Sequence, residues 1–490
     1  MNNLCRFANT ALALALSAGM AGAATIQISS RDPAGVGFND PTVVAPVGGN
    51  PGKTLGEQRM NVYKYVAGLW EKALASDVVI TVSAGWEPLT CDMTTGLLGS
   101  AGPWNVWHDF PGGKPGTWYP AALANKLSGM NLAADQPDDG TGYGNVDIKT
   151  QFNVNLGQPG CLDGSPFYLG LDGNPGNLIS FVETLEHELG HGLGFGVITD
   201  AGSGFRLSAD GLAYVPSGGL PGIWDGFMYD NAAGKTWLDM SNAERQVSGA
   251  TPLNLAWRSP AMQAAAKATL AAVPVIKVAT PAPSGSGLYA YASATFGRVV
   301  APGIFGAFAT VPPDAVNGAG CLAFDASTAA AVKGRVAIID RGACTFVIKA
   351  KNAQNAGAVG VVIAYNAAGA PPGLGGNDPT VTIPVVEVSQ ADGVTLKAVA
   401  AVASHYGSRT TPGLATSAFA TDPARQSGAD AAGRPLLYTP NPFILGSSVS
   451  HWDISALPNL LMEPNIVADM TVSLVPPLDL TRPLLTDLGW

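Results

Sequence analysis

The sequence predicts an α+β protein built from more than one domain. Helical and strand-like patterns alternate before a histidine- and glutamate-rich helix near residue 187. A separate block at about 273–405, rich in Ala, Gly and Val, has a strand–helix–strand pattern of its own. A chain of 490 residues is also too long for one ordinary hydrophobic core, so we expect two or three domains.

Composition and charge narrow the class of protein. Hydrophobic residues make up 47% and charged residues 13%, with 61 Gly and 37 Pro, which is typical of a loop-rich globular chain. The formal net charge is -10, and the chain has no run of Lys and Arg that would neutralise phosphate groups. We therefore expect no nucleic-acid partner.

The first residues have the pattern of a secretory signal peptide. Arg6 supplies the positive charge, residues 10–18 the apolar run and residues 21–23 the small-residue cleavage site. We expect removal of residues 1–23 and a secreted or periplasmic location. A single membrane anchor is the alternative, although the run is short for a span, and no later segment predicts a membrane span after cleavage.

Four cysteines remain after signal cleavage. An even number in an exported chain favours two disulfides, and the spacing suggests Cys91 with Cys161 and Cys321 with Cys344. Neither pair has the close spacing of a zinc-binding C-x-x-C motif.

The first part of the mature chain predicts a helix followed by strands. Residues 54–74 begin with the capping residue Thr54 and repeat apolar residues every three or four positions, which indicates an amphipathic helix. Residues 78–82 are rich in β-formers, and residues 146–154 alternate apolar and polar side chains. These elements lead into the histidine-rich helix.

That helix is expected to begin near Leu178 with Asn177 as its N-cap. Glycines at 190, 192, 194 and 196 then become too frequent for a helix. We expect a sharp turn near Gly194, because a residue without a Cβ can adopt a positive φ.

Within this helix lies the motif H-E-x-x-H. His187 and His191 are four residues apart and so lie on one helix face, where both can bind one metal ion with Glu188 beside it as a base. A catalytic zinc ion usually has three protein ligands and one position open to water.

The third ligand must come from farther along the chain. In the pattern H-E-x-x-H-x-x-G-x-x-H the last position is occupied by Val197, which cannot bind a metal. Asp200 and His451 are the candidates. His451 is favoured because Met462 follows it, before Pro464, where it could form the apolar floor below a metal.

These segments resemble one peptidase family. The residues H-E-x-x-H-G-x-G-F at 187–195, S-H-W at 450–452 and L-M-x-P at 461–464 resemble the leishmanolysin-type metzincins, in which an insertion separates the second and third zinc histidines. The resemblance implies a zincin/metzincin-like catalytic domain with Zn2+ as cofactor. It implies the following roles: zinc ligands His187, His191 and His451, catalytic base Glu188 and Met-turn residue Met462.

The intervening block resembles a second family. Its sequence contains R-G-x-C-x-F-x-x-K at 341–349 and N-A-Q-x-A-G-A-x-G at 352–360, both signatures of the protease-associated (PA) domain. A strand at 336–340, a helix at 346–356 and a strand at 359–365 fit this resemblance. The family implies a β-rich, sandwich-like accessory module without catalytic residues.

The predicted organisation is therefore a signal peptide at 1–23, a first catalytic part at 24–272, an inserted PA domain at 273–405 and a second catalytic part at 406–490. Residues 409–433 are expected to be a returning linker, and residues 478–490 a closing helix below the Met-turn. The predicted function is a secreted zinc endopeptidase acting on protein or peptide substrates, with Glu188 as general base. The alternative is a catalytically inactive exported binding or cell-surface interaction protein that uses the PA domain.

Overall fold

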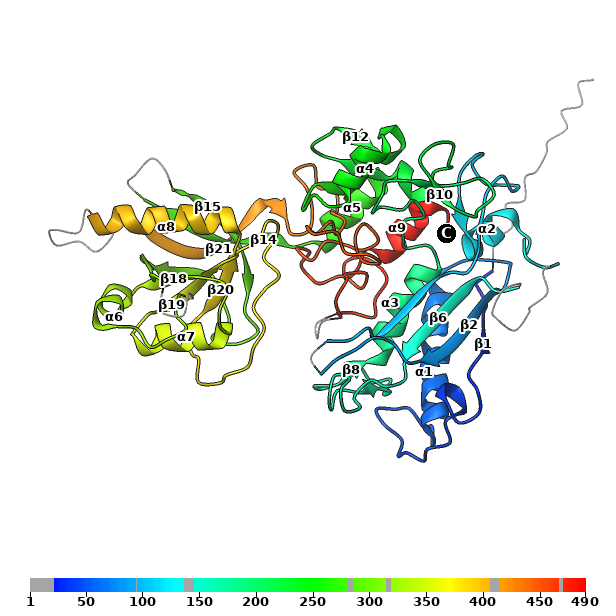
Figure 1. Ribbon diagram of the computed structural model, residues 1–490, viewed down its shortest axis with the longest axis horizontal. Coiled ribbons are helices and arrows are strands. Elements are labelled where there is room, and N and C mark those ends of the chain that lie inside the picture. The colour runs from blue at the N-terminus through cyan, green and yellow to red at the C-terminus, as the bar shows by residue number, and fades with distance from the viewer. Residues whose placement is uncertain are drawn as a thin grey trace, which may run out of the picture.

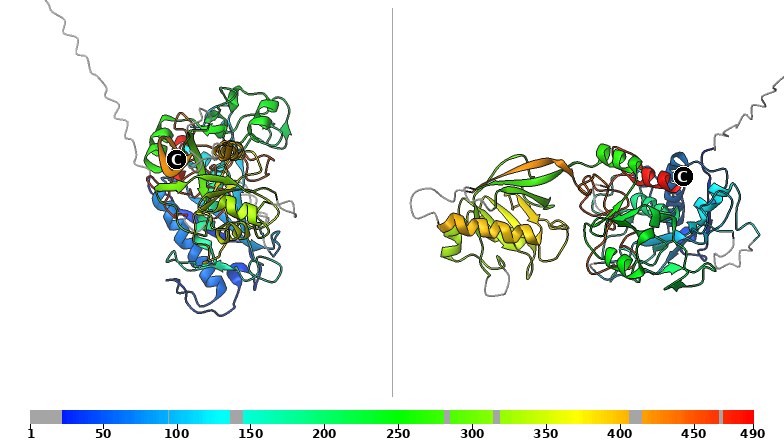
Figure 2. Two further views of the ribbon diagram at one scale, coloured as in Figure 1. Left: turned by 90° about the vertical axis from the view of Figure 1, so that its left-hand side faces the viewer. Right: turned by 90° about the horizontal axis from the view of Figure 1, so that it is seen from above.

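The computed structural model describes residues 22–93, 95–135, 145–280, 285–313, 319–405, 415–466 and 470–490. The chain forms two lobes, which the paired strands β14 (Ala272–Ala279) and β21 (Thr416–Gln426) join (Figure 1). The lobes stay separate in the view from above (Figure 2). Nearly all of the expected signal peptide, residues 1–21, lies outside the described residues.

A mixed sheet forms one layer of the larger lobe. Its strand order is β1 (Ile26–Ser30), β2 (Ile80–Glu87), β6 (Ile148–Asn153) and β3 (Gly99–Pro103). Strands β1, β2 and β6 run parallel, whereas β3 is antiparallel to β6. The predicted strand at 146–154 is confirmed as β6, and the β-rich run at 78–82 leads into β2.

Two helices lie together on one face of this sheet, α1 (Leu55–Ala73) and α3 (Phe181–Gly192) (Figure 1). The predicted helix at 54–74 is confirmed as α1. Thr54 accepts a hydrogen bond from the backbone of Glu57, and the Glu57 side chain accepts one from the backbone of Thr54. This reciprocal cap fixes where α1 begins.

Helix α3 begins later than the sequence predicts. Asn177 is not its N-cap, because Ile179–Ser180 form strand β8, which pairs with β7 (Phe167–Tyr168). The hydroxyl of Ser180 accepts a hydrogen bond from the backbone of Glu183 and caps the helix instead. The apolar residues Leu178 and Ile179 had suggested another helical turn, but Ile179 belongs to strand β8 and Leu178 is exposed.

Short elements complete the larger lobe. They are η1 (Gly37–Asn39), β4 (Val106–Trp107), β5 (Tyr119–Pro120), α2 (Ala121–Ser128), β9 (Arg206–Leu207), β10 (Tyr214–Val215), η2 (Ile223–Gly226), β11 (Met228–Asp230), β12 (Lys235–Thr236), η3 (Trp237–Asp239), α4 (Asn242–Ser248), β13 (Leu255–Trp257), α5 (Pro260–Thr269) and α9 (Thr481–Leu488). One hydrophobic core joins α1, α3, α5 and α9.

The smaller lobe is organised around an eight-stranded sheet of order β16-β21-β14-β15-β20-β19-β18-β17. The remaining strands are β15 (Gly287–Ser293), β16 (Gly303–Gly306), β17 (Phe308–Thr310), β18 (Val336–Asp340), β19 (Gly360–Ala364) and β20 (Val385–Val388). Only Ala307 separates β16 from β17, at opposite ends of this order, so the sheet curls back toward itself. The sandwich-like form implied by the resemblance is thus one curled sheet.

Helices cover both faces of its parallel strands. Val336 and Ile338 of β18 pack in the same cluster as Leu396 of α8 (Gln390–His405). The alternate residues Ala337 and Ile339 pack in the cluster that contains Ala350 of α7 (Phe346–Asn355). The short helix α6 (Ala326–Val332) adds Val332 to the second cluster. Burial on both faces explains the continuous apolar runs of these strands.

The expected linker at 409–433 is wrong in its central part, where Thr416–Gln426 form strand β21. This strand pairs with β14 on one side and β16 on the other. Ser417 and Phe419 are buried, whereas the residues between and beside them are more exposed. Burial therefore alternates along the segment, as it does in a strand with one buried face. The polar, Ala-rich composition concealed this alternation.

Both predicted disulfides are present, Cys91–Cys161 in the larger lobe and Cys321–Cys344 in the smaller lobe. The predicted closing helix is confirmed as α9. Among the described residues, no helix combines the length and the apolar character needed to cross a bilayer.

Replacing residues 273–425 with a short Gly/Ser turn should leave the larger lobe folded, because Ala272 and Gln426 are cross-strand partners and already lie side by side. We expect one cooperative thermal transition and a near-UV circular dichroism spectrum with aromatic signals. Extending the deletion back to residue 260 removes α5 and its buried Met262, and this control should unfold. Loss of the transition in the first variant would show that the lobes fold only together.

Candidate metal centre

Three histidines from distant parts of the chain meet in the larger lobe. His187 and His191 lie on α3, and His451 comes from a loop 260 residues beyond His191. The Nε2 atom of His191 lies 3.1 Å from that of His187 and 3.2 Å from that of His451. Among the described residues, these three form the group of side chains able to hold a metal ion.

Asp200, the other candidate for a third ligand, does not belong to this group. Its carboxylate accepts hydrogen bonds from the backbone of Gly202 and the hydroxyl of Ser203, and so it closes the local turn. The structure therefore brings His451, and not Asp200, to the histidine pair.

Each imidazole is oriented by a backbone carbonyl. The Nδ1–H of His187 donates to Leu461 O at 2.7 Å, and that of His191 donates to Phe195 O at 2.6 Å. The Nδ1–H of His451 donates to Ser447 O at 2.8 Å. A neutral imidazole that donates through Nδ1 keeps a free lone pair on Nε2. All three lone pairs are therefore directed into one small space.

This arrangement fits a tetrahedral zinc ion. Zinc–nitrogen bonds of about 2.0–2.1 Å in tetrahedral geometry place neighbouring nitrogens roughly 3.3 Å apart, close to the separations observed. Burial lowers the pKa of His187 to about 3, that of His191 to about 4 and that of His451 well below its ordinary value. The rings are thus neutral at neutral pH, as metal ligands must be.

Glu188 is buried beside this group, directly after His187 and three residues before His191. Burial raises its pKa to about 8, and a hydrogen bond from the backbone of Ala101 in β3 acts in the opposite direction. The positive charge of a bound metal would also favour the carboxylate.

Met462 packs directly against α3. It is fully buried, and a Cβ added at Gly190 would lie only 2.7 Å from its Sδ atom. A Cβ at Gly192 would lie 2.3 Å from Ile148 of β6. These two glycines therefore let the segment of Met462 and the sheet approach α3 closely on either side.

The loop that carries His451 contains a strained residue. Val449 has φ of 71°, a left-handed conformation that β-branched side chains rarely adopt. Its backbone N–H donates to Tyr438 O at 2.7 Å, and Tyr438 N–H donates to His451 O at 2.9 Å. Strain of this kind is typical of functional sites, and here it shapes the turn that presents His451.

The turn after α3 is confirmed at Gly194, where φ is 114°. The indole N–H of Trp224 donates to Gly194 O, and that of Trp490 donates to Leu193 O, both at 2.8 Å. Because this turn leads to Phe195, whose carbonyl orients His191, the two tryptophans stabilise a metal-centre residue from outside.

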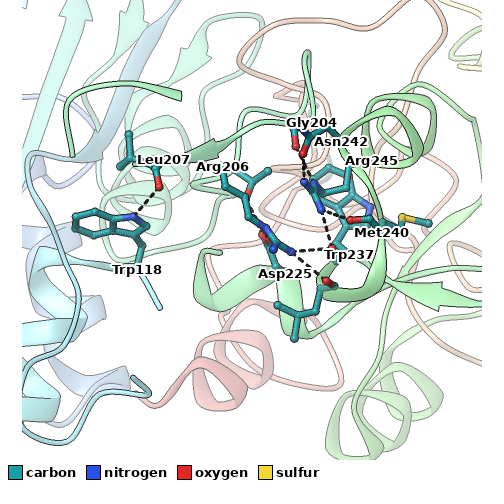
Figure 3. Close-up of polar contacts among 11 residues, drawn as sticks. Trp118, Gly204, Arg206, Leu207, Asp225, Trp237, Met240, Asn242 and Arg245 are labelled. Atoms are coloured by element: carbon teal, nitrogen blue, oxygen red, sulfur yellow. Dashed lines mark hydrogen bonds and ion pairs between the residues drawn. The ribbon is translucent and has the colours of Figure 1, made fainter. Parts of the chain in front are cut away.

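A polar network surrounds Asp225, the residue that follows Trp224 in the chain (Figure 3). Asp225 is fully buried and pairs with Arg206 at 3.3 Å, while Arg206 and Arg245 both donate to Trp237 O. Arg245 also donates to the backbone of Gly204 and Met240. These charges are satisfied within the segment, so we assign them a structural role.

Two features escaped the sequence analysis. Glu186 is buried, its carboxyl oxygens have no hydrogen-bond partner among the described residues, and burial raises its pKa well above the ordinary range. Its position beside the H-E-x-x-H motif gave no signal of burial.

The second feature is a cavity of about 1520 Å³ between the lobes. It is lined by loop residues 369–375, by residues 454–457 and by Glu463, which follows Met462.

Comparisons with known proteins identify the smaller lobe. The model of the PA domain family matches residues 297–396, so a PA domain is present. A comparison with curated proteins finds no match.

Two solved structures show limited similarity. BSAP, a zinc aminopeptidase from Bacillus subtilis, shares 20% identity over 34% of this chain and 36% of its own, with a TM-score of 0.20. An aminopeptidase from Aneurinibacillus sp. strain AM-1 shares 17% identity over 33% of this chain and 36% of its own, with a TM-score of 0.19. The chain thus spans about a third of the length of these structures.

Gly190→Ala should destabilise the larger lobe, by about 1–3 kcal/mol, because the new methyl group overlaps buried Met462. Urea denaturation of the metal-free protein measures this. Gly68→Ala is the matched control: Gly68 lies within α1 with no atom close to an added Cβ, so alanine should stabilise by up to about 1 kcal/mol. Equal effects of both substitutions would contradict the close packing of Met462.

Proposed function

We propose that this chain is an exported zinc-dependent endopeptidase of the leishmanolysin-like metzincin type. The observation that supports it most directly is that the Nε2 atom of His191 lies 3.1 Å from that of His187 and 3.2 Å from that of His451, while each Nδ1–H donates to a backbone carbonyl. The buried Glu188 beside them and Met462 below α3 complete the pattern that the sequence resemblance implies.

In this proposal the three histidines bind the metal and Glu188 transfers the proton. A bound zinc ion supplies a Lewis acid that lowers the pKa of a coordinated water and polarises a peptide carbonyl. The three imidazoles would hold that ion through their Nε2 atoms. Glu188 accepts the proton of the attacking water and delivers it to the nitrogen of the leaving amine.

Two further features support an exported peptidase. Two disulfides are typical of chains that fold outside the cytoplasm. A PA domain is present at 297–396, and the resemblance to this family implies an accessory module without catalytic residues, which leaves catalysis to the larger lobe. A catalytically inactive binding protein would have no use for a buried carboxyl group beside three converging imidazoles, since burying it is costly.

Glu188→Gln should retain zinc but lower peptide hydrolysis by about 100- to 10,000-fold, because the amide cannot accept the proton of water. Metal content by mass spectrometry and cleavage of casein measure the two effects. Unchanged turnover would exclude Glu188 as the base.

His451→Ala should weaken zinc binding by more than the roughly 10- to 100-fold expected on losing an outer hydrogen-bond partner. Asp200→Ala is the control and should keep full occupancy, since Asp200 closes a local turn. The reverse result would make Asp200 the third ligand.

Removing zinc with a chelator should abolish casein cleavage, and adding zinc should restore it. Digestion of a peptide library separates internal cleavage, which the proposal expects, from removal of single N-terminal residues. Casein cleavage that persists after complete zinc removal would contradict a zinc peptidase.

A further inference from the structure

We infer that Asp479 is a positioning residue of the metal centre: its carboxylate fixes the backbone of Leu461, whose carbonyl orients the imidazole of His187. The inference rests on the proposed function, since it concerns how tightly the three histidines hold zinc. It assigns a task to a fully buried aspartate that directly precedes the N-cap of α9.

Two short hydrogen bonds make the connection. The N–H of Leu461 donates to Asp479 Oδ2 at 2.8 Å, and the Nδ1–H of His187 donates to Leu461 O at 2.7 Å. The N–H and the C=O group of Leu461 flank the same Cα atom, so a shift of the amide also displaces the carbonyl. Leu461 directly precedes Met462, so the same bond restrains the Met-turn residue.

Asp479 is itself firmly held. It is fully buried, and its Oδ1 accepts a hydrogen bond from Thr481 N–H at 2.6 Å, where α9 begins. Helix α9 is anchored in the core by Leu484 and Leu485. The carboxylate therefore transmits the position of a rigid helix to Leu461.

Trp490, which follows the C-cap of α9, contacts the other side of the same candidate centre. The indole of Trp490 donates to Leu193 O in the turn that follows α3. The residues that flank α9, Asp479 before it and Trp490 after it, thus contact both backbone segments whose carbonyls orient His187 and His191. A cap that served α9 alone would need only one of the two Asp479 oxygens.

Asp479→Ser separates the contact of Asp479 with Thr481 at the start of α9 from its contact with Leu461. A serine hydroxyl still caps Thr481 N–H, but no oxygen remains at the position of Oδ2. Asp147→Ser is the matched control: Asp147 is buried in the same lobe, burial raises its pKa to about 6 as it does that of Asp479, and it accepts from Thr81 N–H at 2.8 Å. Each variant is measured as the full chain.

The readouts are the zinc dissociation constant, by competition with a chromophoric chelator, and the visible spectrum of the cobalt-substituted protein. We expect Asp479→Ser to raise the dissociation constant about 10- to 100-fold and to alter the cobalt spectrum. Asp147→Ser should leave both within about twofold while lowering urea stability. Equal zinc affinity of Asp479→Ser and wild type, or equal weakening in the control, overturns the inference.

A measurement on the wild type covers the case in which Asp479→Ser does not fold. Coupling between two sites is reciprocal, so zinc should slow hydrogen exchange at the Leu461 amide more than at the Thr81 amide. Equal slowing at both amides overturns the inference. A wild-type protein that binds no zinc overturns the proposed function as well, which distinguishes the two failures.

Discussion

The candidate metal centre depends on three lone pairs that face one another. Neutral imidazoles whose Nδ1–H groups are all engaged present only acceptors on Nε2. The Nε2 atom of His191 lies 3.1 Å from that of His187 and 3.2 Å from that of His451, and acceptors so close together repel. A cation converts this repulsion into binding. Until a cation is present, the surrounding protein must hold the three rings together against the repulsion of their Nε2 lone pairs. The packing around α3 is organised to do so.

Close packing supplies that restraint from several directions. Met462 contacts α3 at Gly190, Ile148 contacts it at Gly192, and the Trp224 and Trp490 indoles hold the following turn. None of these contacts needs a metal. The centre is therefore preorganised by the larger lobe, which reduces the reorganisation that binding requires.

The sequence predicted what depends on local pattern. The spacing in H-E-x-x-H, the cap at Thr54 and the glycine turn at 194 all carry short-range signals, and the structure bears them out. The predicted start of α3 and the predicted linker in place of β21 were wrong, because strand pairing with distant residues overrode the local composition. The roles of Asp479, Glu186 and Trp490 depend on which distant backbone groups they meet, and one sequence without its fold does not show that.

The insertion between His191 and His451 has a mechanical consequence. Each disulfide lies within one lobe, and the segment carrying His451 is attached to the larger lobe by its own contacts, such as Leu437 N–H to Leu255 O. Covalent continuity through the smaller lobe is therefore not what keeps the third imidazole in place. A single proteolytic nick inside that lobe would yield two fragments that remain associated, with the metal centre still assembled.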